Sequence, residues 1–318
     1  MKYVFYGTPE FAAVSLQALL EQGCRPLAVV TSPDRASGRG LRTGYTPVKA
    51  LALEHGLQVW QPENLRDPDF LNQLKELNAD FQLVVAFRKL PLEVWDGFPL
   101  GTWNLHASLL PDLRGAAPIH WAIRWGYTTT GLTVFRINDR IDTGAMLCQA
   151  SLDILSSWNA GDLHDAMARL GGELLVKAAR QIDGGSASTQ TQPSGMNLRS
   201  APKISKEDAV LDWNQSSTSL LHFVRAFAPS PGARTFLGDR LWIVLELAKS
   251  DFPTVLPKDE LDSLVPGTLR VEGFRCWVRG GDGWLEILSI KPQNSKAMPM
   301  DAFLRGQPPL NGFVLTGN

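Results

Sequence analysis

The sequence KYVFYGTPE at residues 2–10 carries a strand that is followed at once by the start of a helix. Its alternating apolar run ends at Gly7, Thr8 is a residue type that caps helices, and Pro9 suits the first helical position. Gly23 marks the expected end of that helix, and a second apolar run follows at residues 27–31. The opening of the chain is therefore typical of a βαβ unit.

The same unit repeats along the first half of the chain. Helix-start signals recur at Thr46-Pro47 and Asp67-Pro68, and an apolar run follows each predicted helix. We predict strands at residues 58–60, 81–87, 102–105 and 131–137, and a long helix at 161–182, where apolar residues recur at helical spacing. This alternation predicts an α/β domain built on a parallel sheet.

The composition changes at residues 184–195, which read GGSASTQTQPSG. Such a small and polar stretch is typical of a linker with few contacts. Beyond it we predict one helix at 218–227 and short strands at 241–247, 267–271, 274–278 and 284–290, separated by turn residues. A small β-barrel is the simplest fold for this part. The predicted organisation is a domain over 1–183, a linker over 184–203 and a second domain over 204–318.

The overall composition indicates a soluble globular protein, with 44% hydrophobic and 20% charged residues in a chain of 318. No apolar run is long enough to cross a bilayer, and the first strand leaves no room for a signal sequence. We therefore expect a cytoplasmic protein without a membrane partner, and a monomer by default. The formal net charge of -1 means that any contact with nucleic acid must come from a local basic patch.

Several kinds of site are excluded by spacing. The opening glycine lacks the G-x-G-x-x-G pattern of dinucleotide-binding folds, and the chain contains no P-loop motif. The three cysteines are too few and too scattered for a disulfide framework or a CxxC zinc site. The five histidines show no ligand spacing, so we expect no metal.

Three residues are candidates for catalysis. Asn104 and His106 are two positions apart at the end of a predicted strand, so their side chains face the same way. An amide that donates to a developing oxyanion, beside an imidazole that handles a proton, suits attack on a carbonyl. Asp142, in a later loop, can orient that imidazole. The alternatives are that Asn104 caps a turn, that His106 is a core histidine and that Asp142 is a turn residue.

The stretch NLHASLLP at residues 104–111, with RGAAP at 114–118 and DTG at 142–144, resembles the signature of the folate-dependent formyltransferase superfamily. The stretches FYGTPEFA at 5–12, PDRASGRG at 33–40 and TPVK at 46–49 are similar to the members that act on methionyl-tRNA. Residues 201–204, Trp213 and residues 225–233 extend the likeness into the second domain. The resemblance implies a Rossmann-like catalytic domain, an OB-like barrel that supports tRNA binding, and 10-formyltetrahydrofolate as donor.

The resemblance also implies roles for individual residues. Asn104 and His106 would hold the oxyanion of a tetrahedral intermediate, and Asp142 would steer the imidazole and assist proton transfer. Folate would be bound by three groups of residues: Phe87, Arg88, Lys89 and Leu90; Ser108, Leu109, Leu110 and Pro111; and Asn138, Asp139 and Arg140. The initiator tRNA would be bound by Arg35, Arg39, Arg42 and Lys49. Asp112 and Arg140 depart from the family pattern, which expects a basic or neutral residue and a small one.

The segment from Pro33 to Tyr45 is longer than a βα connection normally needs. Its three arginines and one aspartate give a net charge of +2. By resemblance it would contact the tRNA acceptor stem; otherwise it is a solvated surface loop. Two other functions stay open, namely a formyltransferase acting on an amino-sugar nucleotide and a non-catalytic RNA-binding module.

Overall fold

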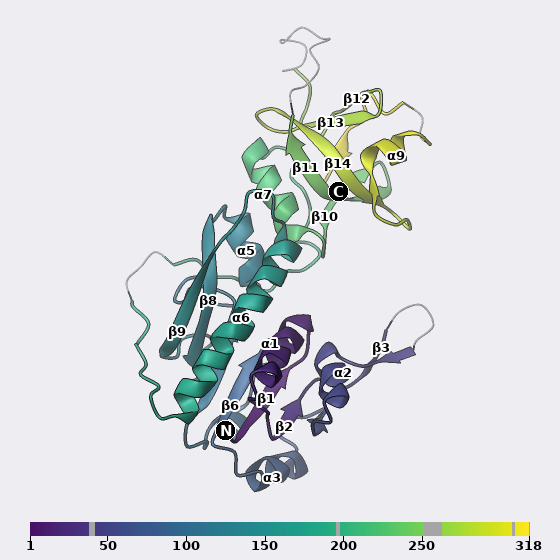
Figure 1. Ribbon diagram of the computed structural model, residues 1–318. Coiled ribbons are helices and arrows are strands. Elements are labelled where there is room, and N and C mark those ends of the chain that lie inside the picture. The colour runs from purple at the N-terminus through teal and green to yellow at the C-terminus, as the bar shows by residue number, and fades with distance from the viewer. Residues whose placement is uncertain (38–41, 195–197, 251–262, 307–308, 318) are drawn as a thin grey trace. The chain divides into compact units, whose positions relative to one another are not determined.

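The structure is a computed structural model that describes residues 1–37, 42–194, 198–250, 263–306 and 309–317 (Figure 1). The chain divides into two compact units. The first comprises Met1–Pro118, Thr129–Asp153 and His164–Pro202, and the second comprises Ile119–Thr128, Ile154–Leu163 and Lys203–Asn318. The sequence predicts domains over 1–183 and 204–318, and these boundaries stay a prediction. The division into units differs from them, because it assigns Ile119–Thr128 and Ile154–Leu163 to the second unit.

The first unit is built on a seven-stranded sheet with the order β5-β2-β1-β6-β7-β8-β9. β5, β2, β1, β6 and β7 are parallel, which confirms the predicted α/β class, but β8 and β9 are antiparallel to their neighbours. β9 was not predicted; its side chains are half-buried or exposed, and Gln149, Ser151 and Asp153 interrupt its apolar residues. The bounds are β1 (Tyr3–Gly7), β2 (Ala28–Val30), β5 (Val59–Trp60), β6 (Phe81–Val85), β7 (Thr102–His106), β8 (Thr129–Arg136) and β9 (Met146–Asp153).

Helices cover the sheet as the capping signals predict, with one exception. The Thr46 side chain accepts a hydrogen bond from Lys49 N at 3.1 Å, and that of Asp67 accepts from Asp69 N at 2.9 Å. We expected Thr8 to cap its helix, but it does not. Its hydroxyl is instead 3.0 Å from the hydroxyl of Ser32. The bounds are α1 (Glu10–Glu21), α2 (Pro47–Glu54), α3 (Pro68–Glu76), α4 (Leu92–Trp95) and α6 (Ala160–Asp183). The next helix after α4, α5 (Pro118–Arg124), falls almost wholly in the second unit.

The apolar core on one face of this sheet fixes which side chains face the site. Val4 and Tyr6 of β1 and Val84 of β6 pack there with residues of α3. Val84 is paired in register with Asn104 of β7, so Asn104 lies on this same face. The strand order reverses between β1 and β6, and ligands of open α/β sheets bind beside such a reversal, at the carboxyl ends of the strands.

The basic segment after β2 contains a two-stranded antiparallel hairpin, which was not predicted. It consists of β3 (Arg35–Ser37) and β4 (Arg42–Gly44). Figure 1 shows β3 leading out beyond α2, away from the sheet. The predicted tRNA-binding residue Arg39 lies outside the described residues.

The second unit contains a curled antiparallel sheet with the order β12-β13-β14-β11-β10-β16, and β15 pairs with β14. Its outer strands meet, because Leu269 N donates to Phe313 O at 2.7 Å and Leu315 N donates to Gly267 O at 2.8 Å. The helix and the four strands predicted for this part of the chain are confirmed as α7, β11, β12, β13 and β14. The bounds are α7 (Ser217–Phe227), β10 (Ala233–Leu237), β11 (Arg240–Lys249), β12 (Leu269–Glu272), β13 (Arg275–Arg279), β14 (Trp284–Pro292), β15 (Met298–Pro299), α9 (Met300–Leu304) and β16 (Leu315–Thr316).

The described part of the predicted linker is attached to the first unit by hydrogen bonds. Gln190 and Met146 exchange two main-chain bonds of 2.8 Å each. Further along, Ala201 N donates to Arg114 O at 2.7 Å. The polar composition gave no indication of these contacts, because they are made largely by the main chain. No helix in the described ranges is both long and apolar enough to span a membrane.

Candidate active site

The site begins with Asn104 and His106 at the end of β7. His106 is 6% exposed, and Asn104 is half-buried. Within the described residues the Asn104 carboxamide has no hydrogen-bond partner, which leaves both of its N–H groups able to bind a ligand. The sequence predicted that these two side chains face the same way, and the structure places both at the end of one strand.

The loop after β7 is held in place by polar side chains from neighbouring strands. Thr133 of β8 donates to Ser108 O at 2.7 Å and accepts from Leu110 N at 3.0 Å. Gln149 of β9 donates to Leu110 O at 2.9 Å, and the Ser108 hydroxyl donates to Asp112 O at 2.6 Å. The unpredicted edge strand therefore helps to fix the loop that carries four of the predicted folate-binding residues.

The imidazole of His106 is held by a hydrogen bond at one of its two nitrogens. Nε2 lies 3.0 Å from the carbonyl oxygen of Leu113. Because a carbonyl oxygen can only accept, this contact assigns a hydrogen to Nε2. Nδ1 then faces Asp142, with 3.8 Å between Nδ1 and Oδ2. That distance is too long for a hydrogen bond, but it places the carboxylate charge next to the ring.

Asp142 is held against the loop that follows His106. Its Oδ2 accepts a hydrogen bond from Gly115 N at 2.9 Å, and its side chain is 15% exposed. Gly115 has φ of +127°, and a Cβ there would lie 2.3 Å from Ala201 O, so only glycine fits. The structure thus brings together Asn104, His106 and Asp142, the three predicted catalytic residues, within the first unit.

Backbone strain gathers at this end of the sheet. Among the described residues, five that are not glycine have positive φ, and two of these are asparagines in turns. The other three are Ala86 at 45°, Leu113 at 56° and Asp142 at 53°. They lie directly after β6, in the loop after β7 and in the loop after β8. Conformations of this kind are unfavourable for such residues and cluster at functional sites.

The predicted folate residues after β6 have different surroundings. Phe87 packs edge to face on Tyr6, with 5.6 Å between ring centroids. The Arg88 guanidinium donates hydrogen bonds to the carbonyl oxygens of Pro62 and Glu63. This side chain therefore links the segment after β6 to the loop after β5. Leu90 is 5% exposed and belongs to the apolar core, whereas Lys89 is exposed.

The predicted folate residues after β8 are more open. The Asn138 side chain accepts from Arg140 N at 3.1 Å and from the Thr143 hydroxyl at 3.0 Å. Asp139 and Arg140 are exposed. The unusual Asp112 has a structural reason, because its carboxylate accepts a hydrogen bond from Arg199 N at 2.8 Å.

The base of the basic hairpin is fixed by an acidic residue. Asp34 accepts hydrogen bonds from the Lys49 ammonium and, at 2.8 Å, from Gln61. The bond from Lys49 is the main reason why the pKa of Asp34 is lowered. Lys49 also lies 4.3 Å from the centroid of the Tyr45 ring. The predicted tRNA-binding residue Lys49 is therefore engaged within the protein, and Arg35 and Arg42 lie on the two strands of the hairpin.

Sequence reasoning missed Gln192, which is 8% exposed and contacts the Asp142 loop. Its Nε2 donates to Asp142 O and to Gly144 O, each at 2.9 Å. Its Oε1 accepts from the Arg114 guanidinium, at 3.1 Å from Nε and 2.5 Å from Nη2. One glutamine in a polar stretch carries no local signal that distinguishes it from its exposed neighbours.

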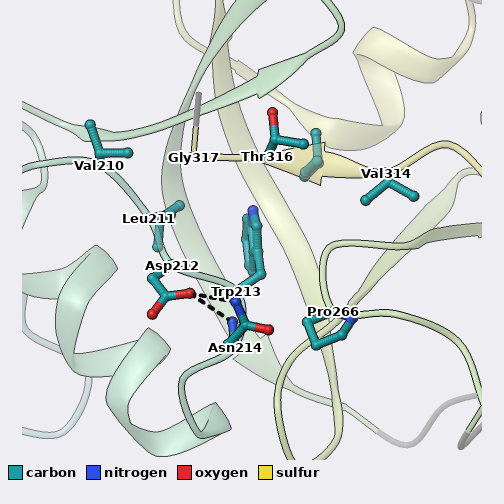
Figure 2. A pocket seen from close by; sticks show the side chains of 10 residues that line it. Val210, Leu211, Asp212, Trp213, Asn214, Pro266, Val314, Thr316 and Gly317 are labelled. Carbon is teal, nitrogen blue, oxygen red and sulfur yellow. Dashed lines mark hydrogen bonds between the residues drawn. The ribbon is translucent and has the colours of Figure 1, made fainter.

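A separate hollow of about 500 Å³ lies in the second unit, beside the last strand (Figure 2). Figure 2 shows Asp212 already bonded to Asn214, whose N and Nδ2 are 3.1 and 2.8 Å from Oδ1. No histidine lines this hollow, so it lacks a proton-handling group like His106. Its lining residues are Val210, Leu211, Asp212, Trp213, Asn214, Pro266, Val314, Leu315, Thr316 and Gly317.

Among the residues that the structure describes, no three or more histidine, cysteine, aspartate or glutamate side chains are grouped so that they could hold a metal ion. The three cysteines are free, and Cys24 and Cys276 are buried. Burial raises the pKa of the Cys148 thiol to about 11, which makes it a poor nucleophile at neutral pH.

The sequence matches two family models. They are Formyl transferase, over residues 1–179, and Formyl transferase, C-terminal domain, over residues 203–308. The methionyl-tRNA formyltransferase of Bacteroides fragilis is 40% identical over 314 residues, covering 96% of this chain and 95% of that protein. The methionyl-tRNA formyltransferase of Symbiobacterium thermophilum is 41% identical over 311 residues, covering 96% and 92%.

A solved structure shares the fold. HypX from Aquifex aeolicus, in complex with tetrahydrofolic acid, superposes with a TM-score of 0.62 at 18% identity, covering 96% of this chain and 47% of that one. At this identity the likeness speaks for the fold alone.

Proposed function

The chain belongs to the formyl transferase family, and from this membership we propose that it transfers a formyl group from 10-formyltetrahydrofolate to the amino group of methionyl-tRNA. The placement of Asn104, His106 and Asp142 around one point of the first unit carries the chemistry. The acceptor is supported by relatives of 40% and 41% identity that match nearly the whole chain and are named for this activity.

The residues at the strand ends suit a folate donor. The main-chain N–H groups of Phe87 and Leu90 have no hydrogen-bond partner within the described ranges, although Leu90 is buried. Buried main-chain groups are nearly always paired, so these are candidates to bind the polar edge of a pterin ring. When bound, this donor supplies an activated one-carbon acyl group. Phe87 and Leu90 would hold it, with the loops at 108–111 and 138–140 on either side.

The three polar residues divide the remaining work. The unpaired Asn104 amide donates to the carbonyl oxygen of the formyl group as negative charge develops on it. His106 keeps its Nε2 hydrogen on Leu113 O, so it takes up and releases a proton at Nδ1. Asp142 faces that nitrogen and offsets the positive charge that the imidazole gains.

The tRNA is assigned to the basic hairpin and the second domain. Arg35 and Arg42 supply positive charge on the hairpin, and Arg39 adds a third arginine to this segment of the sequence. The Asp34–Lys49 pair fixes the base of the hairpin. Such charges bind phosphates and make the affinity depend on salt. An enzyme of this kind works where charged tRNA is found, and we place it in the cytoplasm as a monomer.

A direct transfer assay tests the function. The purified protein would be given 10-formyltetrahydrofolate with methionyl initiator tRNA, with an amino-sugar nucleotide, or with buffer alone. We expect formyl-methionyl-tRNA in the first reaction and no formyl product in the others. Transfer only to the amino sugar would replace the proposed acceptor, and loss of the formyl group to water alone would indicate a hydrolase.

A further inference from the structure

We propose that Gln192 is a positioning residue, which holds the Asp142 loop in the arrangement that the reaction needs. The inference rests on the proposed function and adds a residue to it. Gln192 lies between the two matched domains, in a segment whose composition predicts a linker. Its side chain is nonetheless buried against the candidate active site.

The carboxamide of Gln192 can take only one orientation. An arginine guanidinium donates hydrogen bonds and cannot accept them, so the atom that faces Arg114 must be the amide oxygen. The amide nitrogen then faces Asp142 O and Gly144 O, and its two hydrogens match these two carbonyl groups. Every partner of the side chain thus agrees with one assignment.

The two carbonyl groups belong to a turn that needs support. Asp142 has a φ of +53°, which an aspartate does not prefer. On the far side of the turn, Gly144 lies against the end of β8, where a Cβ would be 1.6 Å from Arg136 O. The turn therefore lies between β8 and Gln192. Loss of the two hydrogen bonds from Gln192 would leave the turn supported only by β8.

Gln192 also connects the two loops that flank His106. Arg114 is next in sequence to Gly115, whose N–H donates to the Asp142 carboxylate. Gln192 therefore bonds to the side chain of one loop and to the main chain of the other. A shift of the Gln192 amide would move Asp142 relative to His106, although within the described ranges Gln192 forms no hydrogen bond with His106 or with the Asp142 carboxylate.

Two substitutions separate the halves of this arrangement. Gln192→Glu keeps an oxygen for Arg114 but loses both donated bonds, and Gln192→Leu loses all of them. Gln190→Glu and Gln190→Leu are matched controls, because Gln190 is exposed and bonds only through its main chain. We expect both Gln192 variants to lower kcat roughly 10-fold to 100-fold, as loss of a supporting partner does elsewhere. The KM for methionyl-tRNA should change little, and the Gln190 variants should match the parent.

A double-mutant cycle tests whether Gln192 acts through Asp142. If it does, Gln192→Glu should cost little further activity in an Asp142→Asn background. Fully additive losses, or a Gln192→Glu variant with the parent kcat, would overturn the proposal.

Hydrogen exchange of the amides around Asp142 and Gly144 gives a readout that needs no activity. We expect faster exchange there in Gln192→Glu, and unchanged exchange would count against the role. If the parent protein transfers no formyl group to methionyl-tRNA, the proposed function fails, while this measurement still tests the role of Gln192 in the loop.

Discussion

Replacing Gly115 by alanine should lower both the catalytic rate and the stability. A Cβ at this position would lie 2.3 Å from Ala201 O, whereas an ordinary contact begins at 3.4 Å, so the two segments must separate by about 1 Å. Gly115 N donates to Asp142, and Ala201 O accepts from Ala117 N at 3.1 Å. The separation therefore strains both of these bonds. A misplacement of about 1 Å lowers catalytic rates by roughly 10²-fold, which is the expected loss in kcat.

The stability cost can be measured separately from the catalytic one. Holding alanine at a φ of +127° costs about 1–3 kcal/mol, and each kcal/mol lowers the Tm of a domain of this size by about 2–4 °C. Gly97→Ala is the matched control, because Gly97 has a φ of +92° and no atom lies within 4 Å of an added Cβ. It should lose stability but keep its kcat. A Gly115→Ala variant with parental kcat would refute the role given to the Gly115–Asp142 hydrogen bond.

Three further predictions address the site, the hairpin and the segment between the domains. Asn104→Ala and His106→Ala should each lower the transfer rate by roughly 10²-fold or more while the far-ultraviolet circular dichroism stays unchanged; parental turnover in either variant would remove that residue from the mechanism. Arg39→Ala combined with Arg42→Ala should weaken tRNA binding and reduce its salt dependence without changing folate affinity, as titrations across a salt series would measure; an unaltered salt slope would identify a solvated loop. Limited proteolysis of the full chain should cut first within residues 184–189, where every residue except the half-buried Ala187 is exposed; first cuts after this range, read by mass spectrometry, would contradict the attachment described above.

Much of the fold follows from local signals in the sequence. Thr46 and Asp67 start helices as their residue types predict, because the cap and the helix are neighbours in the chain. Thr8 has the same signal and serves a different partner, Ser32, which lies 24 residues away. The antiparallel direction of β8 and β9 is likewise set by tertiary pairing, which no local pattern reveals.

The candidate site divides in the same way. Asn104 and His106 are two apart on one strand, so the sequence already placed them on one face. Asp142 was a candidate by residue type and by resemblance, and its separation of 3.8 Å from His106 needed the fold. Gln192 could not be predicted, because its partners lie about 50 and 78 residues away, and two of the three partner residues are bonded through main-chain oxygens.

The meeting of the outer strands in the second unit bears on the solubility of the protein. An open antiparallel sheet presents a row of unpaired N–H and carbonyl groups, along which a strand of another molecule can add. Here Leu269, Phe313, Leu315 and Gly267 pair those groups with each other, so the curled sheet offers no such row at this seam. We therefore expect a substitution that breaks the pairing of these outer strands to cause concentration-dependent aggregation, even where the catalytic domain still folds and binds its donor.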